Sequence, residues 1–156
     1  MTIRRAENKD ISRIIELLTQ VLEIHAAIRP DIFISGTTKY TPEELAVMIR
    51  DDMKPIFAAV DDSDRLLGYA FCQIREILPG GNMVPIRSVF IDDLCVDEAC
   101  RGRGVGKALF RHVADTAKAM GCYEITLNVW EGNDAALNFY KNMGMKVQKT
   151  TMEIII

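Results

Sequence analysis

Hydrophobic residues recur along the chain with two spacings, which predict most of its elements. Ile11, Ile14, Leu18 and Leu22 lie three or four residues apart, and this spacing places one apolar face along a helix. Short apolar runs such as IFAAV, and the alternating run ITLNV, are typical of strands. The pattern predicts strands at 2–5, 56–60, 66–77, 87–96, 122–129 and 146–156, and helices at 10–25, 41–53, 104–120 and 133–143.

The order of these elements indicates one α/β (α+β) domain spanning residues 1–156. A mixed, mostly antiparallel central sheet flanked by about four helices would accommodate them. A chain of 156 residues is long enough to bury one sizeable core without disulfides or a structural metal. We therefore expect a single domain with one core.

Two segments call for a separate explanation. Residues 26–40 show no period and hold Pro30 and a polar Ser-Gly-Thr-Thr-Lys cluster, and loops of this length in compact domains are often functional. The chain ends in three isoleucines at 154–156, which are unfavourable to leave in water. We expect these isoleucines either to lie in a buried strand or to complete a homodimer.

The composition narrows the classes of partner and location. A net charge of −3 without a basic face argues against nucleic acid as a partner. No apolar run approaches the ~20 residues of a membrane span, and residues 1–6 lack the apolar stretch of a signal peptide. Four cysteines without a CxxC pair, and without histidine at metal-ligand spacing, indicate reduced thiols and no metal. We expect a cytoplasmic protein without a membrane partner; a cysteine nucleophile stays open as a minor alternative.

The candidate chemistry centres on a strand, a glycine-rich turn and a helix start between Phe90 and Leu109. Gly102, Gly104 and Gly106 stand at every second position after the strand. Glycines let backbone N–H groups approach a phosphate, and the first N–H groups of a helix have no internal partner. Two arginines in the same turn add positive charge. The turn is therefore a candidate anion site, although a plain strand-to-helix connection fits the glycines alone.

The spacing excludes two phosphate-binding motifs. A P-loop requires Ser or Thr after Gly106-Lys107, where this chain has Ala108. A dinucleotide fingerprint that starts at Gly102 or Gly104 requires glycine at position 107 or 109, and neither position holds glycine. A nucleotide-binding protein of another kind remains the weakest of the alternatives.

Arg101, Gly104 and Gly106 form an Arg-x-x-Gly-x-Gly arrangement that resembles the acetyl-CoA-binding motif of the GNAT N-acetyltransferase superfamily. A second motif of that family, Asn-x-x-Ala-x-x-Phe-Tyr, matches the run NDAALNFY from Asn133 to Tyr140. Two motifs in the right order make the resemblance specific from about residue 66 onward, whereas the first third agrees only in element order. The resemblance implies the GNAT fold and an N-acetyltransferase with acetyl-CoA as co-substrate.

The resemblance also implies where the cofactor binds. In the family, the backbone of the glycine-rich turn holds the pyrophosphate. The strand before it splays from its neighbour and binds the pantetheine and the acetyl carbonyl through backbone amides. By position, the implied cofactor residues are Leu94, Cys95, Val96, Arg101, Gly102, Arg103, Gly104, Val105, Gly106, Lys107, Asn133 and Tyr140.

Four side chains are candidates for the acid–base chemistry. Tyr140 matches the family tyrosine taken as the general acid, although aromatic packing would also explain it. Asp92 and Asp93 are adjacent acids in an apolar strand, which is costly unless a site uses them. Because successive strand residues face opposite sides, we expect one to face the acceptor and the other to make structural hydrogen bonds. The pair resembles the Glu-Asp pair of diamine acetyltransferases, which implies Asp92 as the base, with Glu131 in reserve.

The acceptor site is expected after the first helix, the region that shapes this site in the resembling family. His25, Arg29, Phe33 and Asp93 are the candidate substrate contacts, although His25 could simply be a histidine at a helix end. Acids in the cleft would attract a cationic amine. The leading hypothesis is direct acetyl transfer to a primary amine of a small molecule or peptide. The alternatives are a protein N-terminal or lysine acetyltransferase and a non-catalytic acyl-CoA-binding module.

Overall fold

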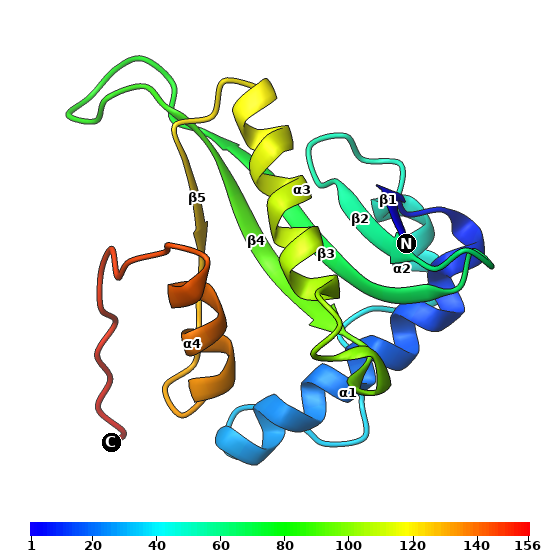
Figure 1. Ribbon diagram of the computed structural model, residues 1–156. Coiled ribbons are helices and arrows are strands. Elements are labelled where there is room, and N and C mark those ends of the chain that lie inside the picture. The colour runs from blue at the N-terminus through cyan, green and yellow to red at the C-terminus, as the bar shows by residue number, and fades with distance from the viewer.

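A computed structural model describes residues 1–156 and contains one five-stranded sheet, with strands in the order β1-β2-β3-β4-β5 (Figure 1). The elements in chain order are β1 (Thr2–Arg5), the short 3-10 helix η1 (Asn8–Asp10), α1 (Ile11–Ile28), α2 (Pro42–Met48), β2 (Ile56–Val60), β3 (Leu66–Glu76), β4 (Arg87–Val96), the 3-10 helix η2 (Glu98–Cys100), α3 (Val105–Ala119), β5 (Glu124–Leu127) and α4 (Asp134–Asn142). None of the helices combines the length and apolar character that crossing a bilayer requires.

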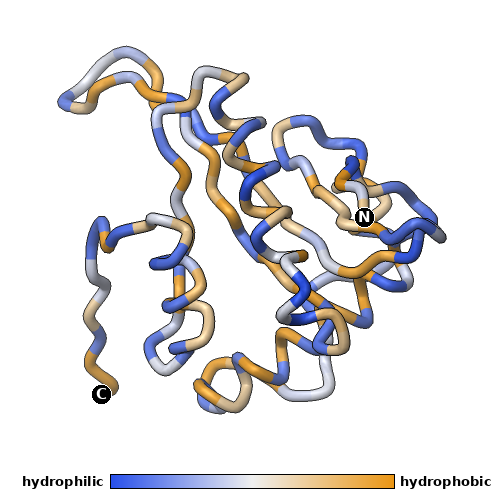
Figure 2. Tube along the Cα trace, viewed as in Figure 1, coloured by the Kyte–Doolittle hydropathy of each residue, from blue (hydrophilic) through white to orange (hydrophobic).

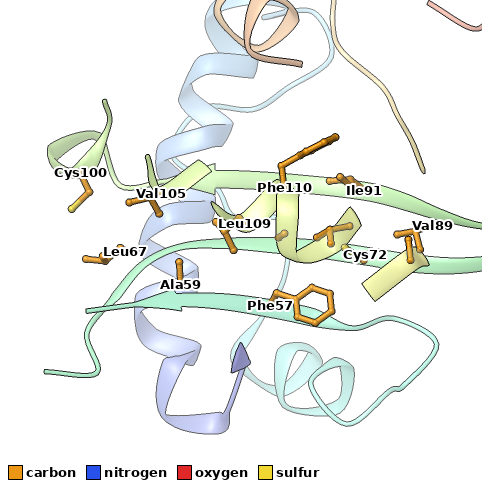
Figure 3. Close-up of a cluster of buried hydrophobic side chains, with 13 residues drawn as sticks. Phe57, Ala59, Leu67, Cys72, Val89, Ile91, Cys100, Val105, Leu109 and Phe110 are labelled. Carbon is orange, nitrogen blue, oxygen red and sulfur yellow. The ribbon is translucent and has the colours of Figure 1, made fainter. Parts of the chain in front are cut away.

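The sheet is mixed and mostly antiparallel, which confirms the predicted fold class. The first four strands pair antiparallel, and β5 pairs parallel to β4. Apolar side chains cover both faces of the sheet. On one face, Leu109 and Val113 of α3 pack over β2, β3 and β4, and Figure 3 shows part of this cluster. On the other face, Ile14 and Leu17 of α1 and Leu45 of α2 pack over β2 and β3.

Local signals in the sequence set where the helices begin. Thr41 Oγ1 accepts a hydrogen bond from the Glu44 N–H at 3.2 Å, and the Glu44 carboxylate accepts one from the Thr41 N–H at 2.8 Å. With Pro42 in the first turn, this is the predicted capping box of α2. The helix ends at Met48, earlier than predicted, whereas α1 continues to Ile28, later than predicted.

The predicted strand at 146–156 is wrong. These residues pair with no strand and are exposed. Figure 2 shows that the apolar C-terminal end lies away from the sheet, on the outer side of α4. Their side-chain contacts with the rest of the chain are a 3.0 Å hydrogen bond from Gln148 to Glu124 and an ion pair between Glu153 and Arg29. Ile154 and Ile155 are 85% and 78% exposed, so they lie in no core of the single chain.

A β-bulge lies in the middle of β4. Phe71 of β3 pairs with Asp93, and the next residue, Cys72, pairs with Ile91, so Asp92 has no partner. One extra residue reverses the alternation of side chains: Ile91 and Leu94 both pack toward α3. Asp92 and Asp93 therefore both face the α1 side of the sheet. The expectation that they face opposite sides is wrong, because that expectation assumes a regular strand.

The sheet splits between β4 and β5. Their pairing ends at Ile91 and Leu127, although β4 continues to Val96. Figure 1 shows the two strands diverging beyond this point, with α4 beside the end of β5. The split leaves the β5 side of β4 open from Asp92 onward.

Candidate active site

The split opens into a cavity of about 510 Å³. Its walls come from five parts of the chain: α1, the loop at 29–41, β4, the end of β5 with the turn after it, and α4. Both acids of β4 line it, together with Leu94, Trp130 and Tyr140. The cavity therefore joins the predicted acid pair to the predicted general acid.

Asp93 is the more deeply set of the two acids. Its Oδ2 accepts a hydrogen bond at 2.8 Å from the hydroxyl of Tyr69, a fully buried residue of β3. Burial raises the pKa of Asp93 to about 6, against the lowering effect of the Tyr69 hydrogen bond and the Lys39 charge. The carboxyl group can thus change protonation state close to neutral pH.

Asp92 is paired with a lysine that the sequence analysis missed. Lys39 Nζ donates to Asp92 Oδ2 at 2.6 Å, and the Tyr40 hydroxyl lies 3.4 Å from the same oxygen. Burial lowers the pKa of Lys39, but the hydrogen bond and charge of Asp92 outweigh it, so the pKa is raised. Lys39 lies within the irregular loop, and no local pattern in the sequence connects it with position 92.

Tyr140 lies on α4 with its ring between two aromatic neighbours. The ring centroids of Phe139 and Phe110 lie 5.1 and 6.2 Å from that of Tyr140. Burial, followed by the negative charge of Asp93, raises the pKa of the Tyr140 hydroxyl. The hydroxyl therefore keeps its proton at neutral pH and can act as a proton donor.

An aromatic group lines the acceptor side of the cavity. The His25 and Phe33 rings lie 5.2 Å apart, and the Trp130 ring meets Phe33 edge-on at 5.4 Å. Burial and the nearby charge of Lys39 lower the pKa of His25, which favours the neutral imidazole. The structure thus places His25 and Phe33, the candidate substrate contacts, in the cavity wall together with Trp130.

The predicted residues Arg29 and Glu131 lie outside the cavity lining, as do the implied cofactor residues Cys95, Val96 and 101–107. Arg29 pairs with Asp31 at 2.7 Å and with Glu153 at 2.6 Å, so its guanidinium links the end of α1 to the C-terminal segment. Glu131 is exposed in the turn after Trp130. The geometry therefore favours Asp92 over Glu131 as the acid next to an acceptor.

The glycine-rich turn leads from β4 into α3 with unpaired backbone donors. Gly104 precedes α3 with a φ of 83°, in the left-handed region that favours glycine. None of the N–H groups from Gly102 to Lys107 donates to another protein atom. Free N–H groups at a helix start, beside exposed Arg101 and Arg103, match the chemistry of a phosphate ligand. A pyrophosphate-bearing cofactor fits this turn.

Two further residues of this turn have other roles. A Cβ added to Gly106 would lie 3.4 Å from Phe139 Cζ and 3.5 Å from Val96 Cγ2, so α3 here packs closely on α4 and β4. The Lys107 side chain lies outside the cavity, in a shallow surface hollow that it shares with Arg111 and His112.

The end of β4 is held in place by α1. Gln20 Nε2 donates to the Val96 carbonyl at 3.1 Å, and Arg13 forms an ion pair with Asp97. The Cys95 thiol is buried against α1, so this residue can offer a ligand only its backbone. Burial raises the pKa of the Cys95 thiol to about 12, which opposes formation of a thiolate nucleophile.

Asn133 begins α4 and also lines the cavity. Its Oδ1 accepts a hydrogen bond from the Ala136 N–H at 3.2 Å, so it caps the helix that carries Tyr140. The second sequence motif therefore sets both the start of α4 and the position of Tyr140 about two turns later.

Comparisons with known proteins agree with this geometry. A family model described as the acetyltransferase (GNAT) family matches residues 4–145. The chain is 33% identical over 115 residues to the peptidyl-lysine N-acetyltransferase YjaB of Salmonella typhimurium, a match that covers 74% of this chain and 66% of YjaB. It is 30% identical over 91 residues to the glucosamine 6-phosphate N-acetyltransferase of Trypanosoma brucei brucei, covering 58% of this chain and 57% of that protein. The chain thus matches somewhat under two thirds of the length of these curated relatives.

Among solved structures, a mutant of the BH1408 protein from Bacillus halodurans has the same fold over the full chain. Its TM-score is 0.95 at 33% sequence identity, and the match covers 100% of this chain and 99% of that one. The structural similarity includes the N-terminal third of the chain, which neither sequence motif covers.

Proposed function

We propose, because the chain belongs to the acetyltransferase (GNAT) family, that it transfers an acetyl group from acetyl-CoA directly to a primary amine. The observation that carries this proposal is the split between β4 and β5. It brings Asp92, Asp93 and Tyr140 into one cavity beside a turn whose backbone donors are free.

The cofactor would be held mainly by backbone. The N–H groups of Gly102 to Lys107 suit the pyrophosphate, with Arg101 and Arg103 supplying charge. The open side of β4 at Leu94 and Val96 suits the pantetheine and the thioester carbonyl. Bound there, acetyl-CoA supplies the thioester that makes the acetyl group transferable.

The side chains would move the protons. Tyr140 is a buried neutral phenol and donates a proton to the departing thiolate. Asp92 lies at the cavity wall and accepts a hydrogen bond from a primary ammonium group, that of Lys39, so we assign it the acceptor amine. His25, Phe33 and Trp130 would contact the rest of the acceptor.

The acceptor is proposed as a small molecule or a peptide with a primary amine. The two curated relatives are named for peptidyl-lysine and for glucosamine 6-phosphate. The Lys39 ammonium offsets the charge of Asp92, which weakens the argument for a polyamine. A module that binds acyl-CoA without turnover is the competing function, and the proton donor in the cavity argues against it.

The deciding experiment measures free-thiol release from acetyl-CoA over a panel of amines. The panel contains lysine peptides, peptides with free N-termini, glucosamine 6-phosphate, amino acids, aminoglycosides and polyamines. Turnover with one class supports the enzyme and identifies the acceptor class. Tight acetyl-CoA binding without turnover on any amine favours the binding module.

Assembly and location are further parts of this proposal. The exposed isoleucines at 154–156 favour a homodimer in which they are covered by a second copy of the chain. All four cysteines are free thiols, as expected in a reducing compartment, which supports the cytoplasm.

A further inference from the structure

We propose that Lys39 is an internal acetyl acceptor: with no external amine in the cavity, its Nζ takes the acetyl group from acetyl-CoA bound to the same chain. This inference deepens the proposed function and rests on it. It assigns a modification site to a lysine outside both sequence motifs.

Lys39 stands where an acceptor amine is required. Its primary amine lies 2.6 Å from Asp92 Oδ2, the carboxylate that we assign to the acceptor. Lys39 lines the same cavity as Leu94 and Tyr140, which lie on the cofactor side of the site. A protein amine and the acid–base groups that would acetylate it thus line one cavity.

The loop that carries Lys39 is fixed near its middle and at its C-terminal end. Near its middle, Ser35 Oγ and the Gly36 N–H each donate to the Glu23 carboxylate of α1 at 2.7 Å. Two residues beyond Lys39, Thr41 caps α2. These two anchors fix the backbone on either side of Lys39. The fold of the loop therefore places Lys39 at the cavity.

No other lysine shares this position. Lys9 lies just before α1, where it forms ion pairs with Glu7 and Asp64, and does not line the cavity. Lys107 lies in the separate surface hollow on α3. Lys118 and Lys149 are exposed. The Lys39 side chain is itself 44% exposed, so accessibility does not distinguish it from these lysines. Selective acetylation of Lys39 would therefore report its place in the cavity beside Asp92.

Groups in the cavity can supply and accept the protons that acetyl transfer to Lys39 requires. The Lys39 ammonium gives one proton to the Asp92 carboxylate, and the neutral nitrogen forms a C–N bond with the acetyl carbonyl carbon. The carbon–sulfur bond breaks, and the thiolate takes a proton from the Tyr140 hydroxyl. The nitrogen then loses its second proton to solvent, the Tyr140 phenolate regains a proton from solvent, and Asp92 releases the proton it took. The products are N-acetyl-Lys39, free CoA and one net proton.

The charged groups around Lys39 set the pH dependence. Burial, the largest single effect, lowers the pKa of Lys39, but Asp92 and Asp93 of β4 and the neighbouring Tyr40 together raise it above its ordinary value. The pKa of His25 on α1 is lowered, which favours the neutral imidazole. An amine must lose a proton before it attacks, so the rate of self-acetylation should rise with pH. The acetylated side chain no longer carries a charge, so Asp92 becomes free for an external ammonium group.

The test incubates the full chain with acetyl-CoA and no other amine, and follows acetylation by intact mass and by peptide mapping. We expect Lys39 to react at least about ten-fold faster than Lys118 or Lys149. The rate should be independent of protein concentration, because donor and acceptor belong to one chain. Lys39→Arg should remove this product, and the matched control Lys149→Arg should not.

Two variants separate site-directed transfer from simple chemical acetylation. Tyr140→Phe and Asp92→Asn should each lower the rate at Lys39 at least about ten-fold, with the rates at Lys118 and Lys149 unchanged. Equal rates at all lysines, or no effect of either variant, would overturn the inference. Turnover of an external amine without acetyl-Lys39 would overturn it too and leave the proposed function standing, whereas failure to bind acetyl-CoA at all would overturn both.

A second readout needs no acetyl donor. Reductive methylation labels free amines, and the Asp92 pair should make Lys39 react more slowly than Lys149. In Asp92→Asn the two lysines should react at similar rates. If Lys39 already reacts as fast as Lys149 in the wild type, its amine is not held at Asp92 and the inference fails.

Discussion

At the scale of single residues, the two adjacent acids of β4 do different work on the same face. Asp93 is a buried acid whose pKa is near 6 because its charged form is poorly solvated. Asp92 is the partner of an ammonium group at the cavity wall. The bulge makes this division possible, since a regular strand would turn one of them toward the α3 core.

The raised pKa of Asp93 predicts a pH-dependent cost to stability. Its folded pKa of about 6 exceeds the ordinary aspartate pKa of 3.8, so the neutral form favours folding at low pH and this contribution is lost as pH rises through 6. Asp93→Asn keeps an acceptor for the Tyr69 hydroxyl and removes the titration. Relative to wild type, the variant should gain roughly 1–3 kcal/mol between about pH 4 and pH 7 in urea unfolding. A constant difference over that range would contradict the buried charge.

Tyr140 can be tested by removing only its hydroxyl. Tyr140→Phe keeps the aromatic packing with Phe110 and Phe139 but loses the proton donor, so turnover should fall about 100-fold or more. Acetyl-CoA affinity by calorimetry should stay within about two-fold of wild type, because backbone groups hold the cofactor. Tyr123→Phe, an exposed tyrosine, is the matched control. Undiminished turnover would exclude Tyr140 as the acid.

The acid pair is visible in the sequence because charged residues are unusual in an apolar strand, and Tyr140 is visible because it completes the second family motif. Sequence reasoning could not find Lys39, since this residue lies 53 positions from Asp92 and no period connects them. It also assigned the two acids to opposite faces, because a bulge leaves no mark on a short apolar strand. Glu131 illustrates the reverse error: proximity in sequence to β5 did not bring it into the cavity.

At the scale of elements, the start of α3 depends strongly on the residue type at one position, Gly104. Positive φ at Gly104 lets the chain turn from β4 into the helix with its N–H groups free. The same conformation recurs at Gly121, which ends the helix with a φ of 69°. The two glycines thus have equal backbone demands but lie at opposite ends of α3.

This pair provides a matched test of the cofactor turn. Gly104→Glu strains the backbone and places a carboxylate beside the free N–H groups, so acetyl-CoA affinity should fall at least about 100-fold. Gly121→Glu imposes similar strain at the far end of α3 and should leave affinity within about three-fold. Calorimetric titration of both folded variants decides the matter; equal affinities would remove the turn from the cofactor site.

Helix starts were predictable from the sequence, and the last strand was not. Thr41, Pro42 and Glu44 specify a helix start through local hydrogen bonds that need no distant partner. A strand needs a neighbour to pair with, and residues 146–156 have none in this chain. Their apolar side chains favour burial, but the sequence alone does not indicate which surface buries them.

At the scale of the whole molecule, the exposed C-terminal segment is the feature that a single chain leaves unexplained. Arg29 and Glu153 fix its path beside the cavity side of the protein, and its last three residues remain in water. A second copy of the chain would cover them. The C-terminal segment would then connect assembly to the α1 end that carries the acceptor loop.

A charge in this segment should separate the chains. Ile155→Glu should shift the protein from dimer to monomer in sedimentation equilibrium, since a buried unpaired carboxylate in an interface is costly. Val47→Glu places the same charge on α2, where Val47 is 72% exposed, and should leave the assembly unchanged. A wild-type protein that is monomeric at all concentrations would refute the dimer.

The close contact between Gly106 and Phe139 couples the two sequence motifs, so the residues at these two positions should change together during evolution. Alanine at position 106 would just meet the Phe139 ring at 3.4 Å, so a longer side chain directed at that ring would need space that Phe139, next to Tyr140, now fills. A mutation in the cofactor turn would thus be felt at the proton donor 34 positions later in the chain. Among descendants of this sequence, position 106 should gain bulk only in lineages where position 139 has already lost it.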